Sequence, residues 1–124
     1  ILVFPSKLEG LGLPLLEGMS CGLPAIATDA PPMNEFVQDG YNGLLAKVAH
    51  KLTRIDNIAF PEEIVDINDL AATMQKLAKD NTLQIAMSNN SRKYAKQHLN
   101  LDKLKHEVIR ILHTLSANET AAQR

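Results

Sequence analysis

The first third of the chain alternates short apolar runs with stretches that hold proline, glycine and polar residues. Continuous apolar runs of this length are typical of strands that are buried on both faces of a parallel sheet. The pattern predicts three such strands, at residues 1–4, 24–28 and 43–46. Between them it predicts a loop over residues 7–13, a short helix that starts at Pro14 and stops at Gly22, and a second short helix over residues 33–38.

The second half of the chain has helical spacing. Residues 66–69 (DIND) resemble a helix cap with an acidic residue three positions on, and the helix that follows has Leu70, Met74 and Leu77 on one side. Further helices are predicted over residues 82–98 and 101–116. The last one has an apolar stripe that is normally core, made of Leu101, Leu104, Val108, Ile111, Leu112 and Leu115. We expect residues 1–117 to form one partial domain and residues 118–124 to form a polar tail.

Residues 47–65 are harder to interpret. The segments KLTRI and IAF flank Asp56-Asn57, which indicates a hairpin-like excursion. Before this stretch, strands and helices alternate, and such a pattern favours right-handed crossovers around a parallel sheet. The predicted fold class is therefore α/β, as a partial Rossmann-like three-layer arrangement with about three parallel strands and helices.

Composition excludes some function classes. The 124 residues suffice for one domain, and 13 basic against 14 acidic residues give a net charge of −1. Aromatic residues make up 4% and Trp is absent, whereas a nucleic-acid binder usually has a basic excess and aromatic platforms, so we expect no nucleic-acid partner. The single cysteine, Cys21, suits a reducing compartment and is expected to be buried. The sequence opens on ILVF without an initiator Met, which we interpret as a fragment that begins within a strand.

The stretch EGLGLPLLEG, residues 9–18, carries the candidate chemistry. It follows the first strand and leads into a helix N-terminus, where free N–H groups attract anions. Gly10 and Gly12 would let a ligand approach the backbone. Glu17, one turn inside the helix, can accept bonds from two adjacent hydroxyls, and Glu9 lies beside the turn. A ligand that is anionic in the middle and rich in hydroxyls at both ends, such as a nucleotide-sugar, fits this arrangement.

Other interpretations stay open at this point. Glu17 could be only a helix-start charge, and Glu9 only loop surface. A dinucleotide-binding half-domain has the same order of strand, glycine-rich loop, helix, strand and acid, with Asp29 as the acid, but its third glycine is missing here. A non-catalytic interaction module is the third alternative. The four histidines show no metal-ligand motif; they are His50, His98, His106 and His113.

The segment from Pro5 to Leu45 resembles the donor-side segment of glycosyltransferases with the B-type fold, in particular glycosyltransferase family 4 (group 1). Glu9 and Glu17 match the family's Glu-x7-Glu pattern, and Glu35 matches a further family glutamate. Residues 39–43 (DGYNG) match its Asp-Gly-x-Asn-Gly turn, and residues 88–99 resemble its late helix with arginine and an aromatic residue. Pro31-Pro32 stand where the family often has a glycine pair.

The resemblance implies the C-terminal, donor-binding part of a retaining glycosyltransferase. Such an enzyme transfers a sugar from a nucleoside-diphosphate sugar to an acceptor glycan or a lipid-linked sugar. Glu9 would be the catalytic residue near the reacting carbon, and Glu17 would hold the ribose hydroxyls. The backbone N–H groups that would line the sugar and the diphosphate belong to Gly10, Leu11, Gly12 and Leu13. No metal is expected, because the resemblance implies a fold that does not usually require one, and no cofactor is expected, because the nucleotide-sugar is a substrate.

The resemblance also implies what this chain needs from elsewhere. The family's Arg and Lys that neutralise the departing diphosphate lie upstream, as does its acceptor-binding N-terminal domain, so we expect the fragment alone to be inactive. The implied location is the cytoplasm, in polysaccharide biosynthesis, with peripheral contact at the inner face of the membrane left open. In the family the last helix packs toward that N-terminal domain, so part of its apolar stripe is expected to be exposed here. Residues 1–4 are expected to form an open apolar edge, and self-association through it or through the last helix would follow.

Overall fold

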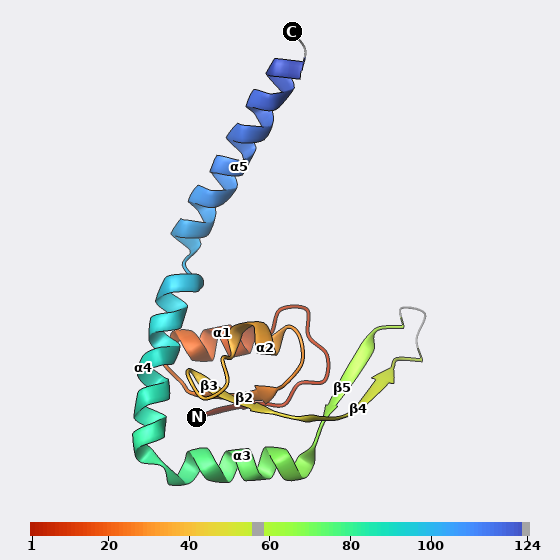
Figure 1. The fold of residues 1–124 in the computed structure, drawn as a ribbon, viewed down its shortest axis with the longest axis vertical. Coiled ribbons are helices and arrows are strands. Elements are labelled where there is room, and N and C mark those ends of the chain that lie inside the picture. The colour runs from red at the N-terminus through yellow and green to blue at the C-terminus, as the bar shows by residue number, and fades with distance from the viewer. Residues whose placement is uncertain (56–58, 123–124) are drawn as a thin grey trace.

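The structure is a computed structural model that describes residues 1–55 and 59–122, with side chains for residues 1–55 and 59–115. Its elements, in chain order, are β1 (Leu2–Phe4), α1 (Leu13–Ser20), β2 (Ala25–Thr28), α2 (Met33–Phe36), β3 (Gly43–Ala46), β4 (Val48–Thr53), β5 (Pro61–Val65), α3 (Ile67–Lys79), α4 (Asn81–His98) and α5 (Leu101–Ala122) (Figure 1). This order confirms the predicted alternation of strands and helices. The Asp56-Asn57 turn of the predicted hairpin lies outside the described residues.

The main sheet has three parallel strands in the order β1-β2-β3. Its register aligns Val3 with Ile26, and Ile26 with Leu44. Within the part of the chain that the structure describes, β1 pairs with β2 alone, so β1 forms one edge of the sheet. The three predicted parallel strands are therefore confirmed, and the carboxyl ends of all three meet at one edge.

The core has two sides because β2 alternates its side chains between the two faces of the sheet. Ala25 and Ala27 point to the face that α1 and α2 cover, while Ile26 points to the face that α3 covers (Figure 1). The buried residues of the first side are Leu15, Met19, Ala25, Ala27, Ala30, Met33 and Val37. Those of the second side are Ile26, Leu44, Leu77 and Met87. Helices on both faces confirm the three-layer arrangement.

Helix α1 lies very close to β1. A methyl group in place of the Gly18 hydrogen would be 2.6 Å from Leu2 Cδ2, so an alanine here would require the Leu2 side chain to shift. The helix ends at Ser20, with Cys21 as its C-cap. The prediction that Cys21 is buried is wrong: its side chain is exposed, because the C-cap lies beyond the last turn that faces the sheet.

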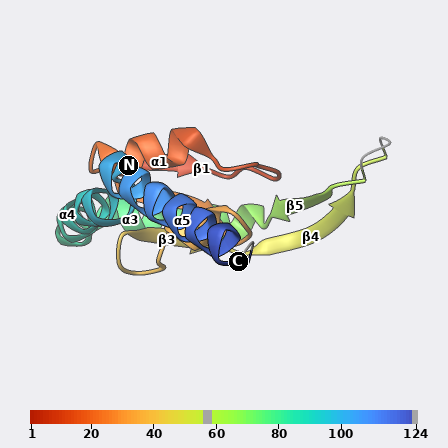
Figure 2. The ribbon, with the colours of Figure 1, turned by 90° about the horizontal axis from the view of Figure 1, so that it is seen from above.

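Strands β4 and β5 form the antiparallel hairpin that residues 47–65 predicted, with Lys51 opposite Glu63. The hairpin projects from the body of the molecule at the end opposite to α4 (Figure 1 and Figure 2). Its base is closed by two hydrogen bonds, from Asp66 N–H to Lys47 O (2.7 Å) and from Lys47 N–H to Asp69 Oδ2 (2.8 Å). Asp66 also caps α3, because its carboxylate accepts from the N–H groups of Asn68 and Asp69. The predicted cap is thus confirmed.

Helix α4 packs against α1, and α5 then leaves the body of the molecule (Figure 1). The Ser88 hydroxyl donates to Gly22 O at 2.6 Å, and the Ser91 hydroxyl donates to Leu23 O at 3.0 Å. The apolar stripe on the last helix is normally core, but no other element of the described residues covers it here. Its apolar side chains are exposed, in agreement with the expectation that part of the stripe is exposed in this chain. The helix also runs to Ala122, beyond the predicted end near Ser116.

Candidate functional site

The loop after β1 is fastened to the carboxyl end of the neighbouring strand. The Thr28 hydroxyl, buried at the end of β2, donates to the carbonyl of Ser6 at 2.8 Å. Asp29 N–H in turn donates to Ala46 O at 2.8 Å, which joins the ends of β2 and β3. These bonds hold the glycine-rich loop at the edge of the sheet where α/β proteins bind their ligands.

Gly12 makes the turn from this loop into α1. It has φ +76° and ψ 50°, a left-handed conformation that glycine adopts without strain, and its carbonyl accepts from Leu15 N–H at 2.9 Å. Helix α1 starts at Leu13, one residue before the predicted start, so Pro14 lies in the first turn, where its missing N–H is harmless.

The turn is exposed at Gly10 and buried at Gly12. A methyl group at Gly10 would meet no atom within 4 Å, so Gly10 borders open space. Within the described part of the chain, four successive N–H groups donate no hydrogen bond; they belong to Gly10, Leu11, Gly12 and Leu13. Unbonded N–H groups at a helix N-terminus are the feature that binds phosphate and other anions.

Glu9 is partly buried and held in place. The Ser6 hydroxyl donates to Glu9 Oε1 at 2.7 Å, which leaves Oε2 as an acceptor for a ligand. Glu9 is therefore more than plain loop surface, because a side chain from the same anchored loop orients its carboxylate.

Glu17 is exposed, and its carboxylate has no hydrogen-bond partner within residues 1–55 and 59–122. The first turn of α1 contains no acidic residue. Because the helix dipole acts mainly within the first turn, a helix-start charge does not account for Glu17. What the structure offers is an accessible, acceptor-only carboxylate on the helix that the glycine turn begins.

Two further residues lie beside the predicted site. A hollow of about 370 Å³, here called the hairpin hollow, is lined by Leu8, Glu9 and Gly10 of the loop and by Arg54 and Phe60 of the hairpin. The sequence analysis missed Arg54 and Phe60. One signal in the sequence could have indicated them. Arg54 and Phe60 lie on either side of the predicted hairpin turn, and the hairpin follows a strand whose carboxyl end lies at the ligand-binding edge of the sheet.

The other residues that carried the resemblance have structural contacts. Asn42 is fully buried, where its Nδ2 donates to Phe36 O at 3.0 Å and its Oδ1 accepts from Gln38 N–H at 2.8 Å. Asp39 Oδ1 accepts from Leu45 N–H at 2.9 Å. These bonds shape the turn before β3. The late helix holds Tyr94, whose pKa is raised by partial burial.

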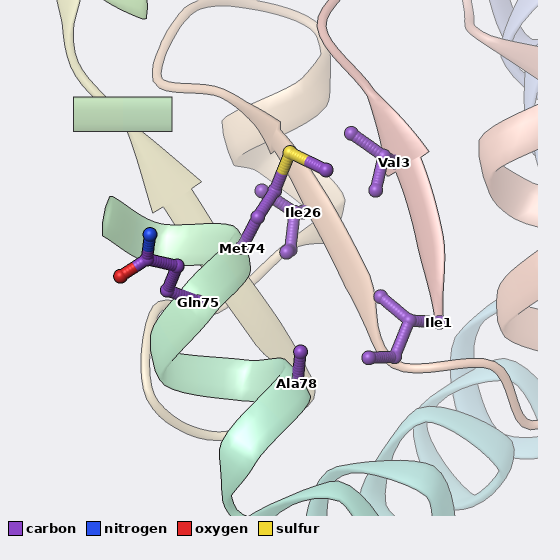
Figure 3. Close-up of a pocket in the computed structure, with 6 residues that line it drawn as sticks. All are labelled: Ile1, Val3, Ile26, Met74, Gln75 and Ala78. Carbon is purple, nitrogen blue, oxygen red and sulfur yellow. The ribbon is translucent and has the colours of Figure 1, made fainter. Parts of the chain in front are cut away.

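A second hollow, of about 410 Å³, lies between the edge of the sheet and α3 (Figure 3). Here called the edge hollow, it is lined by Ile1, Val3, Ile26, Met74, Gln75 and Ala78. Figure 3 shows aliphatic carbons and one methionine sulfur directed toward it, with a single amide at its rim. Without charged groups or several polar groups that converge, this hollow is a poor site for a hydroxyl-rich or anionic ligand.

Metal-ligating side chains are scattered over the molecule. Among the described residues, no group of three or more His, Cys, Asp or Glu side chains could hold a metal ion. In the same part of the chain, none of the helices combines the length and the hydropathy that crossing a bilayer requires.

The dinucleotide-binding alternative fits the packing poorly. In that fingerprint a third glycine brings the helix close to the strand. Here the corresponding position is Leu15, which is buried in the core, and the close approach comes later, at Gly18. Asp29 follows β2 as the fingerprint's acid would, but its Oδ1 already accepts from Asn34 Nδ2 at 3.0 Å.

Comparison with known proteins shows the family of this chain. Residues 1–94 match the family model described as "Glycosyl transferases group 1". The chain is 33% identical over 96 residues to an uncharacterized glycosyltransferase of Methanocaldococcus jannaschii, over 77% of this chain and 23% of that protein. It is 48% identical over 44 residues to the O-antigen chain mannosyltransferase B of Escherichia coli, over 36% of this chain and 11% of that protein. The chain thus spans less than a quarter of the length of either relative.

A solved structure has a similar fold. Sucrose-phosphate synthase from Thermosynechococcus elongatus aligns with 94% of this chain at a TM-score of 0.74, while the alignment covers 25% of that protein. The sequence identity is 24%, so the likeness concerns the fold alone.

Proposed function

This chain belongs to the glycosyl transferases of group 1 and has the α/β fold of B-type glycosyltransferases, and from that premise we propose that it is the donor-binding part of a retaining glycosyltransferase. The enzyme would bind a nucleoside-diphosphate sugar, break the bond between the anomeric carbon and the diphosphate, and form a bond from that carbon to an acceptor oxygen. The acceptor would be a glycan or a lipid-linked sugar, and its hydroxyl proton would leave with the departing group or to solvent.

One observation carries the proposal: two carboxylates flank a turn whose four N–H groups are free for a ligand. The N–H groups of residues 10–13 suit the diphosphate, because they lie at a helix N-terminus. Glu17, exposed on α1, suits the ribose diol, and Glu9, oriented by Ser6, suits the hydroxyls of the donor sugar.

The proposal includes dependence on the rest of the protein. Leaving-group stabilisation is often a large catalytic contribution, and in the family the cations that provide it belong to residues before this segment. We therefore propose that the full-length enzyme is active in the cytoplasm without a metal or cofactor. We also propose that residues 1–124 alone do not catalyse sugar transfer.

The test uses the full-length protein with UDP-glucose, UDP-galactose, UDP-N-acetylglucosamine and GDP-mannose, measuring donor hydrolysis and calorimetric binding. Glu17→Ala should weaken binding of the matching nucleoside diphosphate at least roughly tenfold, because a charged hydrogen bond contributes about 1.5–3 kcal/mol. Glu9→Gln should reduce turnover with little change in nucleotide affinity. NMR of the product would report whether the anomeric configuration is retained.

A matched control is Glu107→Gln on α5, a residue whose carboxylate pairs with Arg110 and whose pKa that pairing lowers. It should behave as wild type. If Glu9→Gln and Glu17→Ala also behave as wild type, or if only nicotinamide dinucleotides bind, the assignment of the two glutamates is wrong.

A further inference from the structure

We propose that the β4–β5 hairpin forms a second wall of the substrate site, in which Arg54 and Phe60 hold a pyranose ring against Glu9 and Gly10. This inference rests on the proposed function, because it names residues that recognise the sugar of that reaction. The residues that carry it line one hollow of about 370 Å³, although they are more than forty positions apart in the sequence.

The hairpin is attached to the loop that holds Glu9. Glu63 N–H in β5 donates to the carbonyl of Lys7 at 2.8 Å, and Lys7 Nζ lies 3.0 Å from Glu62 Oε2. In Figure 1 the loop after β1 lies next to β5 accordingly. These contacts fix the hairpin two residues before Glu9, so the position of the hairpin relative to the glycine turn is built into the fold.

The strand register directs Arg54 and Phe60 to the side of the hairpin that meets the loop. Leu52 lies opposite Glu62, and Arg54 N–H donates to Phe60 O at 3.0 Å just beyond the last paired residues. Side chains two positions apart on a strand, and those opposite each other across an antiparallel pair, share a face. Arg54 and Phe60 therefore share the face of Glu62, the residue that reaches Lys7.

The opposite face of the hairpin has other contacts. Lys51 Nζ lies 3.1 Å from Glu63 Oε1 in a pair that joins the two strands. Thr53 is exposed and alternates with Arg54, so its side chain points to this other face. Thr53 thus offers a control position next to Arg54 that does not line the hairpin hollow.

The chemistry of the hairpin hollow suits a sugar ring. Phe60 is 52% exposed, so its ring is accessible and can pack against the C–H face of a pyranose. A guanidinium only donates hydrogen bonds and a carboxylate only accepts them, so a sugar hydroxyl can accept from Arg54 and donate to Glu9. Gly10 leaves room beside Glu9 for the ring.

The pyranose could come from the donor or from the acceptor, and binding experiments separate these sources. The full-length protein carries Arg54→Gln, Phe60→Leu or Phe60→Tyr, with Thr53→Ala as the control. Calorimetry compares UDP with UDP-glucose and GDP with GDP-mannose. Hydrolysis without acceptor and transfer to a panel of methyl pyranosides complete the measurements.

A role toward the donor sugar predicts that Arg54→Gln and Phe60→Leu weaken nucleotide-sugar binding at least fivefold, while binding of the nucleoside diphosphate stays unchanged. A role toward the acceptor predicts unchanged donor binding and hydrolysis, with a KM for the methyl pyranoside raised at least fivefold. In either case Phe60→Tyr should retain most of the function, because it keeps the ring, and Thr53→Ala should match wild type.

The inference is overturned if Arg54→Gln and Phe60→Leu match wild type in all these measurements while wild type binds and turns over a donor. That result would leave the proposed function intact. A wild-type protein that binds none of the four nucleotide-sugars would instead overturn the proposed function, and this inference with it. Far-UV circular dichroism of each variant would verify that the fold is retained.

Discussion

The Ser6 hydroxyl donates a hydrogen bond of 2.7 Å to Glu9 Oε1. Ser6 is itself held by the buried Thr28, whose hydroxyl donates to the Ser6 carbonyl at 2.8 Å. The orientation of the carboxylate at the glycine turn thus depends on the end of the neighbouring strand. A catalytic carboxylate needs such support, because small errors in placement reduce rates strongly.

Ser6→Ala should therefore reduce turnover of the full-length enzyme without removing binding. A hydrogen bond to a carboxylate is charge-assisted and contributes about 1.5–3 kcal/mol, so kcat should fall roughly tenfold or more, with nucleotide affinity unchanged. Ser20→Ala is the matched control, because the Ser20 hydroxyl donates to Leu16 O at 2.7 Å within α1 and away from Glu9. Equal rates for Ser6→Ala and wild type would show that the hydrogen bond does not position Glu9.

The two glycines of the turn should respond differently to alanine. Gly12→Ala should destabilise the fold by about 1–2 kcal/mol, because an L-residue is strained at φ +76°. Gly10→Ala should leave the stability nearly unchanged, since its methyl group would meet nothing within 4 Å, yet it should weaken donor binding by occupying the space before the free N–H groups. Urea unfolding and calorimetric titration measure the two effects. Identical behaviour of both variants in both measurements would contradict this division of roles.

Asn42 should be required for stability rather than for chemistry. Asn42→Ala removes two hydrogen bonds inside the body of the protein, to Phe36 O and from Gln38 N–H, and leaves those groups without partners. We expect a loss of about 2–4 kcal/mol in the free energy of unfolding. Asn34→Ala, which removes one exposed bond to Asp29, should cost less than 1 kcal/mol. A small loss for Asn42→Ala would mean that water replaces its bonds.

The apolar stripe of α5 should promote association of this chain without stabilising its fold. Leu104 and Leu112 are 59% and 60% exposed, so Leu104→Ser with Leu112→Ser should change the free energy of unfolding by less than about 0.5 kcal/mol per site. Sedimentation at high concentration should show more monomer for this variant than for wild type, with Lys105→Ser as the control. A wild-type chain that is already a sharp monomer would argue against self-association through α5.

Local patterns were sufficient for most of the fold. The apolar runs of β1, β2 and β3, the stop at Gly22 and the cap at Asp66 are each determined by a few neighbouring residues, and the structure confirms all of them. Cys21 was predicted to be buried and is exposed, and the stripe of α5, which is normally core, is uncovered here. An amphipathic or apolar position shows that burial would be favourable, but it does not show whether another element is present to cover it.

The sequence indicated the candidate site only for those residues that are neighbours along the chain. Glu9, Glu17 and the residues between them lie on one turn and one helix, so their spacing already indicates a shared ligand. Arg54 and Phe60 reach the same place through a register that no local pattern specifies, and through the bond between Glu63 and Lys7. Long-range contacts of this kind have no periodicity for a sequence analysis to detect.

The closure of the hairpin at its base has a consequence for the segment that it encloses. Lys47 is hydrogen-bonded to both Asp66 and Asp69, so the chain leaves the sheet and returns to α3 at the same place. These bonds do not depend on the residues that form the hairpin between them. Lengthening a loop between fixed ends costs little conformational free energy. The segment between these bonds can therefore be replaced while the glycine turn stays unchanged, and under the role proposed for the hairpin such a replacement would change the sugar preference.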